Sequence, residues 1–250
     1  MRTPTENKKV LRAPHFLAKA AELNTYLRSL TENEIAKVMK INPDLTHKTM
    51  LQIESWSSDP TLQMTAIDTF LGDIYSGFQA SRLDEQDRKF ADNCLIILSG
   101  LYGMIKPLDG IMPYRLEMAY KLLGFKTPNL YKFWGDKIAQ QIPKNEVILN
   151  LSSVEYSKVI TDYVDESRFV TPKFLTINSS TKQPTFVVVH AKIARGAFAR
   201  WVIQNRIEDT EALQNFNELG YRFDEKLSTK FVPVFVCQTF EGLGLSVRLS

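Results

Sequence analysis

The chain has 250 residues, of which 44% are hydrophobic and 24% are charged. This composition is typical of a globular protein and excludes a disordered chain, and no apolar run approaches the roughly 20 residues that span a bilayer. The net charge of +3 is too small to indicate a partner by itself. Cys94 and Cys237 lie far apart in the sequence, which favours free thiols and a reducing, cytoplasmic compartment.

The N-terminal part is predicted to be helical after a polar arm. Residues 1–12 are polar and basic and contain Pro4, so they are expected to be extended. Apolar residues at helical spacing then predict helices over about 14–30 and about 44–56. Between them, a capping box of Thr31 and Glu34 starts another helix.

The next stretch is predicted to form a strand, a turn and a helix. Thr65 to Phe70 suggests a strand, and Gly72 to Phe78 reads as a turn bracketed by glycines. The spacing of these glycines fits neither a dinucleotide-binding nor a Walker phosphate loop. Asp84 is expected to cap a helix over residues 85–98.

The segment from Cys94 to Glu117 is expected to carry function. Glycine and proline interrupt its apolar residues, so Lys106 and Arg115 should be held on a stiff backbone. This favours a binding surface, with a purely structural corner as the alternative. The interruptions are Gly100, Gly103, Pro107, Gly110 and Pro113.

The second half of the chain is predicted to mix strands and helices. A helix opens at Leu130 and ends before Pro143, and a strand over Glu146 to Leu151 passes into a helix. The polar residues Asn150 to Tyr156 at that junction are either a ligand site or a helix cap. Two strands, Phe169 to Leu175 and Thr185 to Val189, suggest an antiparallel hairpin around a polar loop.

A basic helix is predicted after His190. Lys192, Arg195, Arg200 and Arg206 fall on one side of it, and no acid occurs between Ala191 and Ile207. Its N-terminus follows a strand and presents free N–H groups, which favours anion binding at Lys192 and Arg195. A solvated amphipathic face is the alternative.

Metal, cofactor and nucleophile signatures are absent from the sequence. His15, His47 and His190 have no metal-ligand spacing, and no nucleophile elbow occurs. We therefore expect no metal and no cofactor. Enzymatic activity would rest on the Asn150 to Tyr156 junction and on His190 near Arg195.

Several segments resemble, in this order, those of the YaaA family of bacterial peroxide-stress proteins, over residues from about 14 to about 231. They begin with Gly72-Asp73-Ile74-Tyr75-Ser76-Gly77, Leu98-Ser99-Gly100-Leu101-Tyr102-Gly103 and Lys106-Pro107-Leu108-Asp109. They continue with Pro113-Tyr114-Arg115-Leu116-Glu117-Met118, Tyr131-Lys132-Phe133-Trp134-Gly135-Asp136, Ala191-Lys192-Ile193-Ala194-Arg195-Gly196 and Phe216-Asn217-Glu218-Leu219-Gly220-Tyr221.

The resemblance implies a cytoplasmic protein with a single α/β (α+β) domain over residues 1–250. It implies a mixed sheet surrounded by helices in a fold of its own, a positively charged cleft, a helix-hairpin-helix-like element and DNA binding. It also implies a role in limiting hydrogen peroxide damage, by lowering free intracellular iron. The helix over 85–98, the Gly100 to Gly103 turn and the chain after it are the candidate for the hairpin element.

Two parts depart from the family pattern. Members usually begin with a short apolar strand and a Ser-Pro-Ala-Lys segment, whereas this chain begins with Met1-Arg2-Thr3-Pro4. Residues 232–250 form an atypical tail where a short strand and a basic end are expected. A missing strand is expected to expose the edge of its neighbour in the sheet.

Our leading hypothesis is a non-catalytic protein that binds duplex or branched DNA by shape and acts in the oxidative stress response. The basic cleft would neutralise phosphates, and two glycines would let the backbone approach them. The alternative is an enzyme acting on a nucleotide or nucleic acid with Asn150, Ser153, Glu155 and Tyr156; an iron-handling protein lacks an evident ligand set. The proposed DNA-binding residues are Gly100, Gly103, Lys106, Arg115, Lys192, Arg195 and Arg200.

Overall fold

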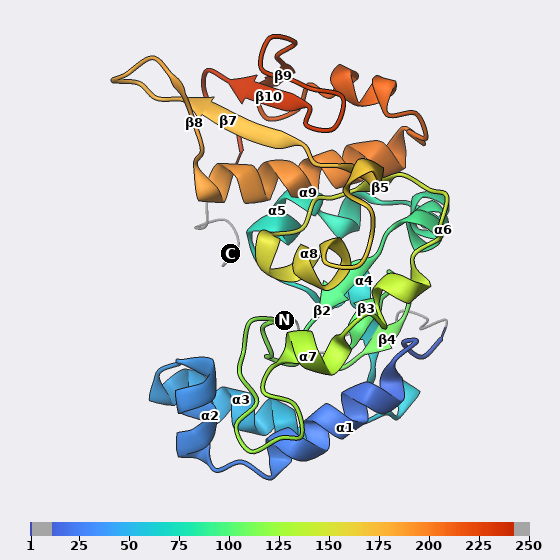
Figure 1. Cartoon of the computed structure of the whole chain (residues 1–250), viewed down its shortest axis with the longest axis vertical. Helices are drawn as coiled ribbons and strands as arrows, with labels where there is room; N and C mark the ends of the chain where they lie inside the picture. Colours follow the sequence, from blue (N-terminus) through green and yellow to red (C-terminus); the bar gives the residue numbers. More distant parts are fainter. Residues whose placement is uncertain (2–11, 243–250) are drawn as a thin grey trace. The chain divides into compact units, whose positions relative to one another are not determined.

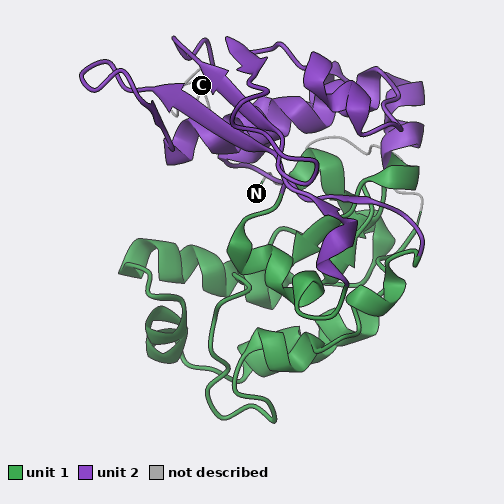
Figure 2. Ribbon diagram, turned by 45° about the horizontal axis from the view of Figure 1, so that its top comes forward, with its two compact units in different colours: residues 1–69, 92–144, 152–164 green, residues 70–91, 145–151, 165–250 purple. Residues whose placement is uncertain are grey.

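The computed structural model describes residue 1 and residues 12–242. Most of the predicted arm and the end of the predicted tail lie outside these residues. The chain divides into two compact units, shown in Figure 2. Unit 1 contains Met1–Thr69, Asp92–Lys144 and Ser152–Val164, and unit 2 contains Phe70–Ala91, Asn145–Leu151 and Asp165–Ser250. The predicted α+β class is confirmed, and a single domain over the whole chain stays a prediction.

The first part of unit 1 is helical, as predicted (Figure 1). The helices are α1 (Leu17–Arg28), α2 (Glu32–Met39) and α3 (Pro43–Ser55). The Thr31 hydroxyl accepts from the Glu34 N–H, and the Glu34 carboxylate accepts from the Thr31 N–H, so the capping box is confirmed. Asn42 caps α3 by accepting from the Leu45 N–H at 2.9 Å.

The predicted strand over residues 65–70 is wrong except at its start. After the 3₁₀ turn η1 (Pro60–Leu62), β1 covers only Met64–Thr65 and the chain turns into α4 (Ala66–Thr69). The Thr65 hydroxyl donates to the Asp68 carboxylate at 2.6 Å and so supports the helical turn. β1 pairs antiparallel with β4 (Gly110–Ile111).

The predicted helix over 85–98 is too long. Helix α6 covers Glu85–Cys94, the boundary between the units falls within it, and residues 97–99 form strand β2. β2 pairs antiparallel with β3 (Gly103–Ile105). The β-branched Ile96 and Ile97 favour extended backbone, and Ile97 pairs with Ile105 of β3.

The remaining helices of unit 1 are short. They are α7 (Leu130–Trp134), the 3₁₀ turn η3 (Ala139–Gln141) and α8 (Val154–Thr161). The predicted helix from Leu130 to Pro143 is broken because Gly135 takes φ +51° at the end of α7. Trp134 is fully buried, and its indole N–H donates to the Gly100 carbonyl at 3.1 Å.

Unit 2 contains a four-stranded sheet in the order β8-β7-β10-β9. The strands are β7 (Lys173–Ile177), β8 (Pro184–Thr185), β9 (Tyr221–Phe223) and β10 (Val234–Cys237). β7 and β8 form the predicted antiparallel hairpin, whereas β10 runs parallel to β7 and antiparallel to β9. The start of the predicted atypical tail thus supplies a central strand.

Proline and helix formation shorten the two predicted strands. Pro172 interrupts the first, so that β6 (Phe169–Val170) pairs in parallel with β5 (Ile148–Leu149), apart from β7. The second ends at Thr185 because α9 (Val188–Gln204) begins where its continuation was expected. Three 3₁₀ turns complete the described part of unit 2: η2 (Ala80–Arg82), η4 (Glu166–Arg168) and η5 (Glu211–Asn215).

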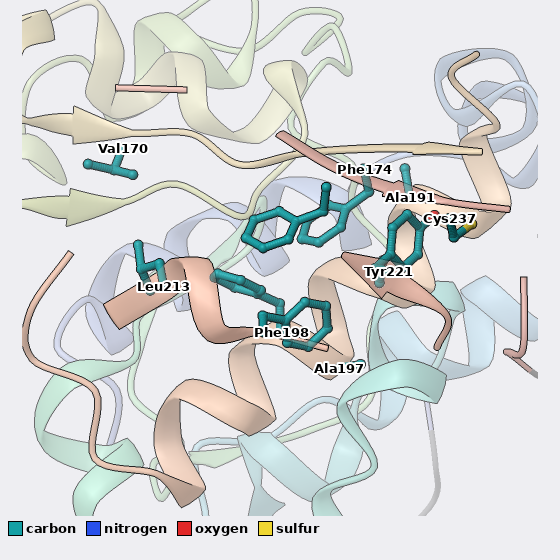
Figure 3. Close-up of a cluster of buried hydrophobic side chains, with 11 residues drawn as sticks. Val170, Phe174, Ala191, Ala197, Phe198, Leu213, Tyr221 and Cys237 are labelled. Carbon is teal, nitrogen blue, oxygen red and sulfur yellow. The ribbon is translucent and has the colours of Figure 1, made fainter. Parts of the chain in front are cut away.

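Helix α9 lies between the sheet and α5 (Asp73–Phe78), as Figure 1 shows. The predicted turn over Gly72 to Phe78 is therefore wrong, because these residues form a helix against α9. Phe174 and Phe198 lie in the buried aromatic core of unit 2 (Figure 3). Phe235 belongs to the same core. The Phe174 and Phe235 rings stack with centroids 5.4 Å apart.

The crossing of α5 and α9 depends on two glycines. A Cβ atom on Gly196 would lie 1.8 Å from the Ile74 carbonyl oxygen, and one on Gly77 would lie 1.9 Å from the Ile193 carbonyl oxygen. Each backbone therefore occupies the space that a side chain of the other helix would need. None of the described helices combines the length and apolar character needed to cross a membrane.

Candidate functional site

Two of the predicted basic residues remain accessible on α9. Lys192 is exposed, and its Nζ atom lies 3.9 Å from the Asp73 carboxylate. Arg195, one turn further on, is half-buried and makes no hydrogen bond or ion pair with another described residue. Burial lowers the pKa of Arg195, because no carboxylate compensates the loss of water around its guanidinium.

The prediction that Arg200 lies on the same exposed face is wrong. Its exposed fraction is 4%, and its guanidinium donates to the Gly77 carbonyl at 2.6 Å and to the Glu218 carboxylate at 2.5 Å. Arg206 lies beyond the end of α9 and pairs with Asp87 at 2.8 Å. The basic face is shorter than predicted because α5 covers Arg200 and because the helix ends at Gln204.

Gly100 and Gly103 pack against the protein's own chain. A Cβ atom on Gly100 would lie 2.1 Å from the Leu116 carbonyl oxygen, and one on Gly103 would lie 2.7 Å from the Trp134 ring. Both glycines are buried: Gly100 follows β2 directly, and Gly103 is the first residue of β3. Strands β2 and β3 stand here where the helix-hairpin-helix element was predicted, so that element is not confirmed. The approach of the backbone to phosphates through these glycines stays a prediction.

Lys106 begins a tightly held loop. Its N–H donates to the Asp109 carboxylate at 2.8 Å, and the Asp109 N–H donates back to the Lys106 carbonyl at 3.1 Å. Arg12 joins Asp109 to Asp92, with contacts of 2.8 Å to each carboxylate. Burial raises the pKa of Asp109, and the charge of Arg12 partly opposes this rise. The loop thus presents the half-buried Lys106 on fixed backbone.

Arg115 belongs to a cluster of polar side chains in unit 1 that we call the Arg115 cluster: Arg115, Glu117, Tyr120, Glu155 and Tyr156. Tyr156 donates from its hydroxyl to Glu117 Oε2 at 2.5 Å, and the Ala119 N–H donates to Glu155 Oε1 at 3.0 Å. The Arg115 side chain is half-buried, and its Nε atom is sealed from solvent with no acceptor among the described residues.

Burial and charge shape the titration of the two tyrosines in this cluster. The pKa of Tyr156 is raised, first by burial and then by the carboxylate of Glu117. Burial also raises the pKa of Tyr120, while the neighbouring Arg115 guanidinium opposes that rise. Both hydroxyls are thus neutral hydrogen-bond donors near neutral pH.

The junction from Asn150 to Tyr156 is divided between the units. Asn150 belongs to unit 2, and its N–H donates to the Val170 carbonyl at 2.8 Å. Ser153 precedes α8 in unit 1 but its side chain makes no capping hydrogen bond. Glu155 and Tyr156 join Arg115 and Glu117. Sequence reasoning did not pair Tyr156 with Glu117, because 39 positions separate them and no local pattern links them.

His190 is held in unit 2 by neighbours rather than by Arg195. Its Nδ1 atom lies 3.0 Å from the Thr176 hydroxyl, and its ring stacks on Phe240 with centroids 3.9 Å apart. Burial lowers its pKa. Within the described part of the chain, no group of three or more His, Cys, Asp or Glu side chains is placed to hold a metal ion.

Comparison with known proteins shows which family this chain belongs to. A family model described as "Peroxide stress protein YaaA" matches residues 1–227. A UPF0246 protein of Salinispora tropica is 48% identical over 99% of this chain and 94% of its own length. UPF0246 proteins of Marinomonas sp. and Roseobacter denitrificans are 39% and 38% identical, each over 89% of this chain and 87% and 89% of their own lengths. The chain belongs to the peroxide stress protein YaaA family.

Proposed function

We propose that this protein acts in the peroxide stress response by binding the DNA backbone, and that this helps to limit iron-dependent peroxide damage. The family description supports the role in peroxide stress. The DNA contacts come from Lys192 and Arg195 in unit 2 and from Lys106 and Arg115 in unit 1. Arg200 supports α9 from inside unit 2 and does not itself touch DNA.

The main support for DNA binding is the half-buried Arg195 guanidinium, which has no acidic partner among the described residues. A guanidinium that is half-buried without an acid loses hydration and gains no compensating partner. A phosphate supplies two oxygens in the geometry that guanidinium donors match. Because α9 contains no Asp or Glu, no acid within the helix competes for this position.

Lys192 adds a second positive charge one turn away. Its contact with Asp73 is long, at 3.9 Å, and the lysine side chain is half exposed. The Asp73 side chain is only 11% exposed, so Lys192 need not leave it: its ammonium group has three N–H donors and can meet a phosphate from the solvent side. A contact between Lys192 and a phosphate depends on charge and not on the base sequence, as expected for a protein that recognises DNA by shape.

The test is DNA binding across a salt series with a double variant, Lys192→Ala with Arg195→Ala. Loss of two phosphate contacts should reduce the salt slope by about 2 and weaken duplex and branched DNA alike. The matched control is Lys226→Ala with Lys230→Ala, which removes the same charge from exposed positions of the same unit. Equal slopes for both double variants would refute the assignment of α9.

A second candidate function is an enzyme acting on a nucleotide, and the 2.5 Å hydrogen bond between Tyr156 and Glu117 favours it. Glu155 is the weaker candidate for a base, because its Oε1 atom already accepts from the Ala119 N–H. Turnover of nucleotides or nucleic acid that Glu117→Gln abolishes, with binding retained, would establish this function. Absence of turnover by the folded wild-type protein would refute it.

A further inference from the structure

The backbone that carries Arg115 and Glu117 is fixed by packing. Leu116, between them, lies against Gly100, where a Cβ atom would meet its carbonyl oxygen at 2.1 Å. The hydroxyls of Tyr114 and Ser99 lie 2.6 Å apart, and Tyr156 holds Glu117 from α8. Two charged side chains of opposite sign are therefore presented on a rigid segment, as a preorganised binding site requires.

Arg115 has unused donors on this segment. The Tyr120 hydroxyl lies beside its guanidinium, but no carboxylate within the described residues forms an ion pair with it, and its enclosed Nε atom has no acceptor. The Nε atom is closed to a ligand, so an oxyanion would contact the terminal N–H groups of this half-buried guanidinium, whose charge no described carboxylate compensates. Glu117 and Glu155 lie nearby, so a singly charged phosphodiester suits the cluster better than a doubly charged terminal phosphate.

Glu117 supplies the complementary acceptor. Tyr156 occupies its Oε2 atom, whereas Oε1 accepts no hydrogen bond from another described residue. A carboxylate accepts from N–H groups on nucleobases. Each base carries such donors on its Watson–Crick edge, and base pairing in a duplex engages them.

We propose that the Arg115 cluster binds one unpaired nucleotide of a DNA strand, with its phosphodiester on Arg115 and a base N–H group on Glu117. This inference rests on the proposed DNA binding and specifies the part of the substrate that unit 1 recognises. It separates two roles: α9 neutralises backbone charge on any DNA, and the Arg115 cluster selects DNA with an unpaired base. The chemistry requires no bond to form or break.

The test compares three DNAs of one length: a perfect duplex, a duplex with a short single-stranded gap, and the same gap built from abasic residues. Arg115→Gln should weaken binding to both gapped DNAs by about tenfold and binding to the duplex by a clearly smaller factor, because only one general phosphate contact is lost there. Glu117→Gln should weaken binding to the gap with bases by about fivefold and leave the abasic gap unchanged. Lys132→Ala, an exposed change in the same unit, is the matched control.

Arg115→Lys is a control that separates loss of the binding site from loss of folding. It keeps the charge and loses the paired donors, so it should retain the salt slope but lose preference for the gap. Equal affinity of the wild type for gap and duplex, or equal loss by Glu117→Gln on the abasic gap, would overturn this inference while DNA binding stands. Release of the gapped DNA by free mononucleotides at matched concentration would instead assign the site to free nucleotides. Failure of the wild type to bind any of the three DNAs would overturn the proposed function itself.

Discussion

Replacing Gly196 by alanine tests the helix crossing that positions Lys192 and Arg195. Two effects oppose each other. Alanine is a better helix former than glycine by about 1 kcal/mol in a helix interior. The added Cβ atom, however, would lie 1.8 Å from the Ile74 carbonyl oxygen and 2.6 Å from the Phe78 nitrogen. Both are backbone atoms, so no rotamer change can relieve the clash.

We expect the clash to outweigh the gain in helix propensity, so that Gly196→Ala lowers the stability of the protein. Ordinary contact with these atoms requires α5 and α9 to separate, and this would disturb the fully buried Ala197 and Phe198 on the same helix. Overpacking of a well-packed core costs typically about 1–3 kcal/mol and more where backbone must move, so we expect a net loss of about 2 kcal/mol or more. Separation of the helices should also weaken the hydrogen bond that Arg200 donates to the Gly77 carbonyl at this crossing.

Urea unfolding of Gly196→Ala, followed by tryptophan fluorescence, measures the loss as a lower midpoint. Ala199→Gly is the control, because it changes the same helix at a half-buried position and should cost only about 1 kcal/mol through helix propensity. DNA binding by the folded fraction of Gly196→Ala should also weaken. A variant as stable as the wild type, or more stable, would show that the crossing does not need glycine here and would refute the reasoning.

Two further changes probe the ion pairs. Arg200→Leu should destabilise the protein by about 2–4 kcal/mol, because it leaves the Gly77 carbonyl and the Glu218 carboxylate without their donor; a thermal midpoint within the scatter of the wild type would contradict this. Arg12→Ala should cost about 1–3 kcal/mol near neutral pH, less than for a fully buried pair because the Arg12 side chain is 39% exposed. The pKa of Asp109 is already raised in the folded state, so its ionisation costs stability as pH rises through that pKa. Removal of Arg12 increases this cost, so the difference in unfolding free energy between wild type and Arg12→Ala should widen from about pH 4 to pH 7; a difference that is constant with pH would refute the pairing.

Local signals in the sequence were sufficient where the structure is local. The capping box at Thr31 and Glu34 and the hairpin of β7 and β8 each depend on residues close together in the chain. The family, too, could be identified from short segments, and the comparisons confirm it. These features involve contacts over a few residues, and such contacts leave periodic or motif-like patterns.

Prediction failed where a distant partner decides the conformation. Residues 97–99 read as the end of a helix because Leu95 and Leu98 fit its stripe, but pairing with β3 makes them a strand. Gly72 to Phe78 read as a turn, although α9 provides the surface against which a helix forms. Propensity differences of less than about 1 kcal/mol per residue are easily outweighed by such tertiary contacts.

The candidate site shows the same division. The sequence by itself determined which residues carry positive charge, that Lys192 and Arg195 share a helix face, and that Arg115 lies on a constrained segment. Only the tertiary structure decided which of these charges remain available. Arg200 is neutralised inside unit 2 by Glu218, whereas Arg195 has no acid. Arg115 lies beside the Tyr120 hydroxyl and forms no ion pair with a described carboxylate. Charge is a property of each side chain, but its compensation depends on neighbours brought together by the fold, and one-dimensional spacing does not specify them.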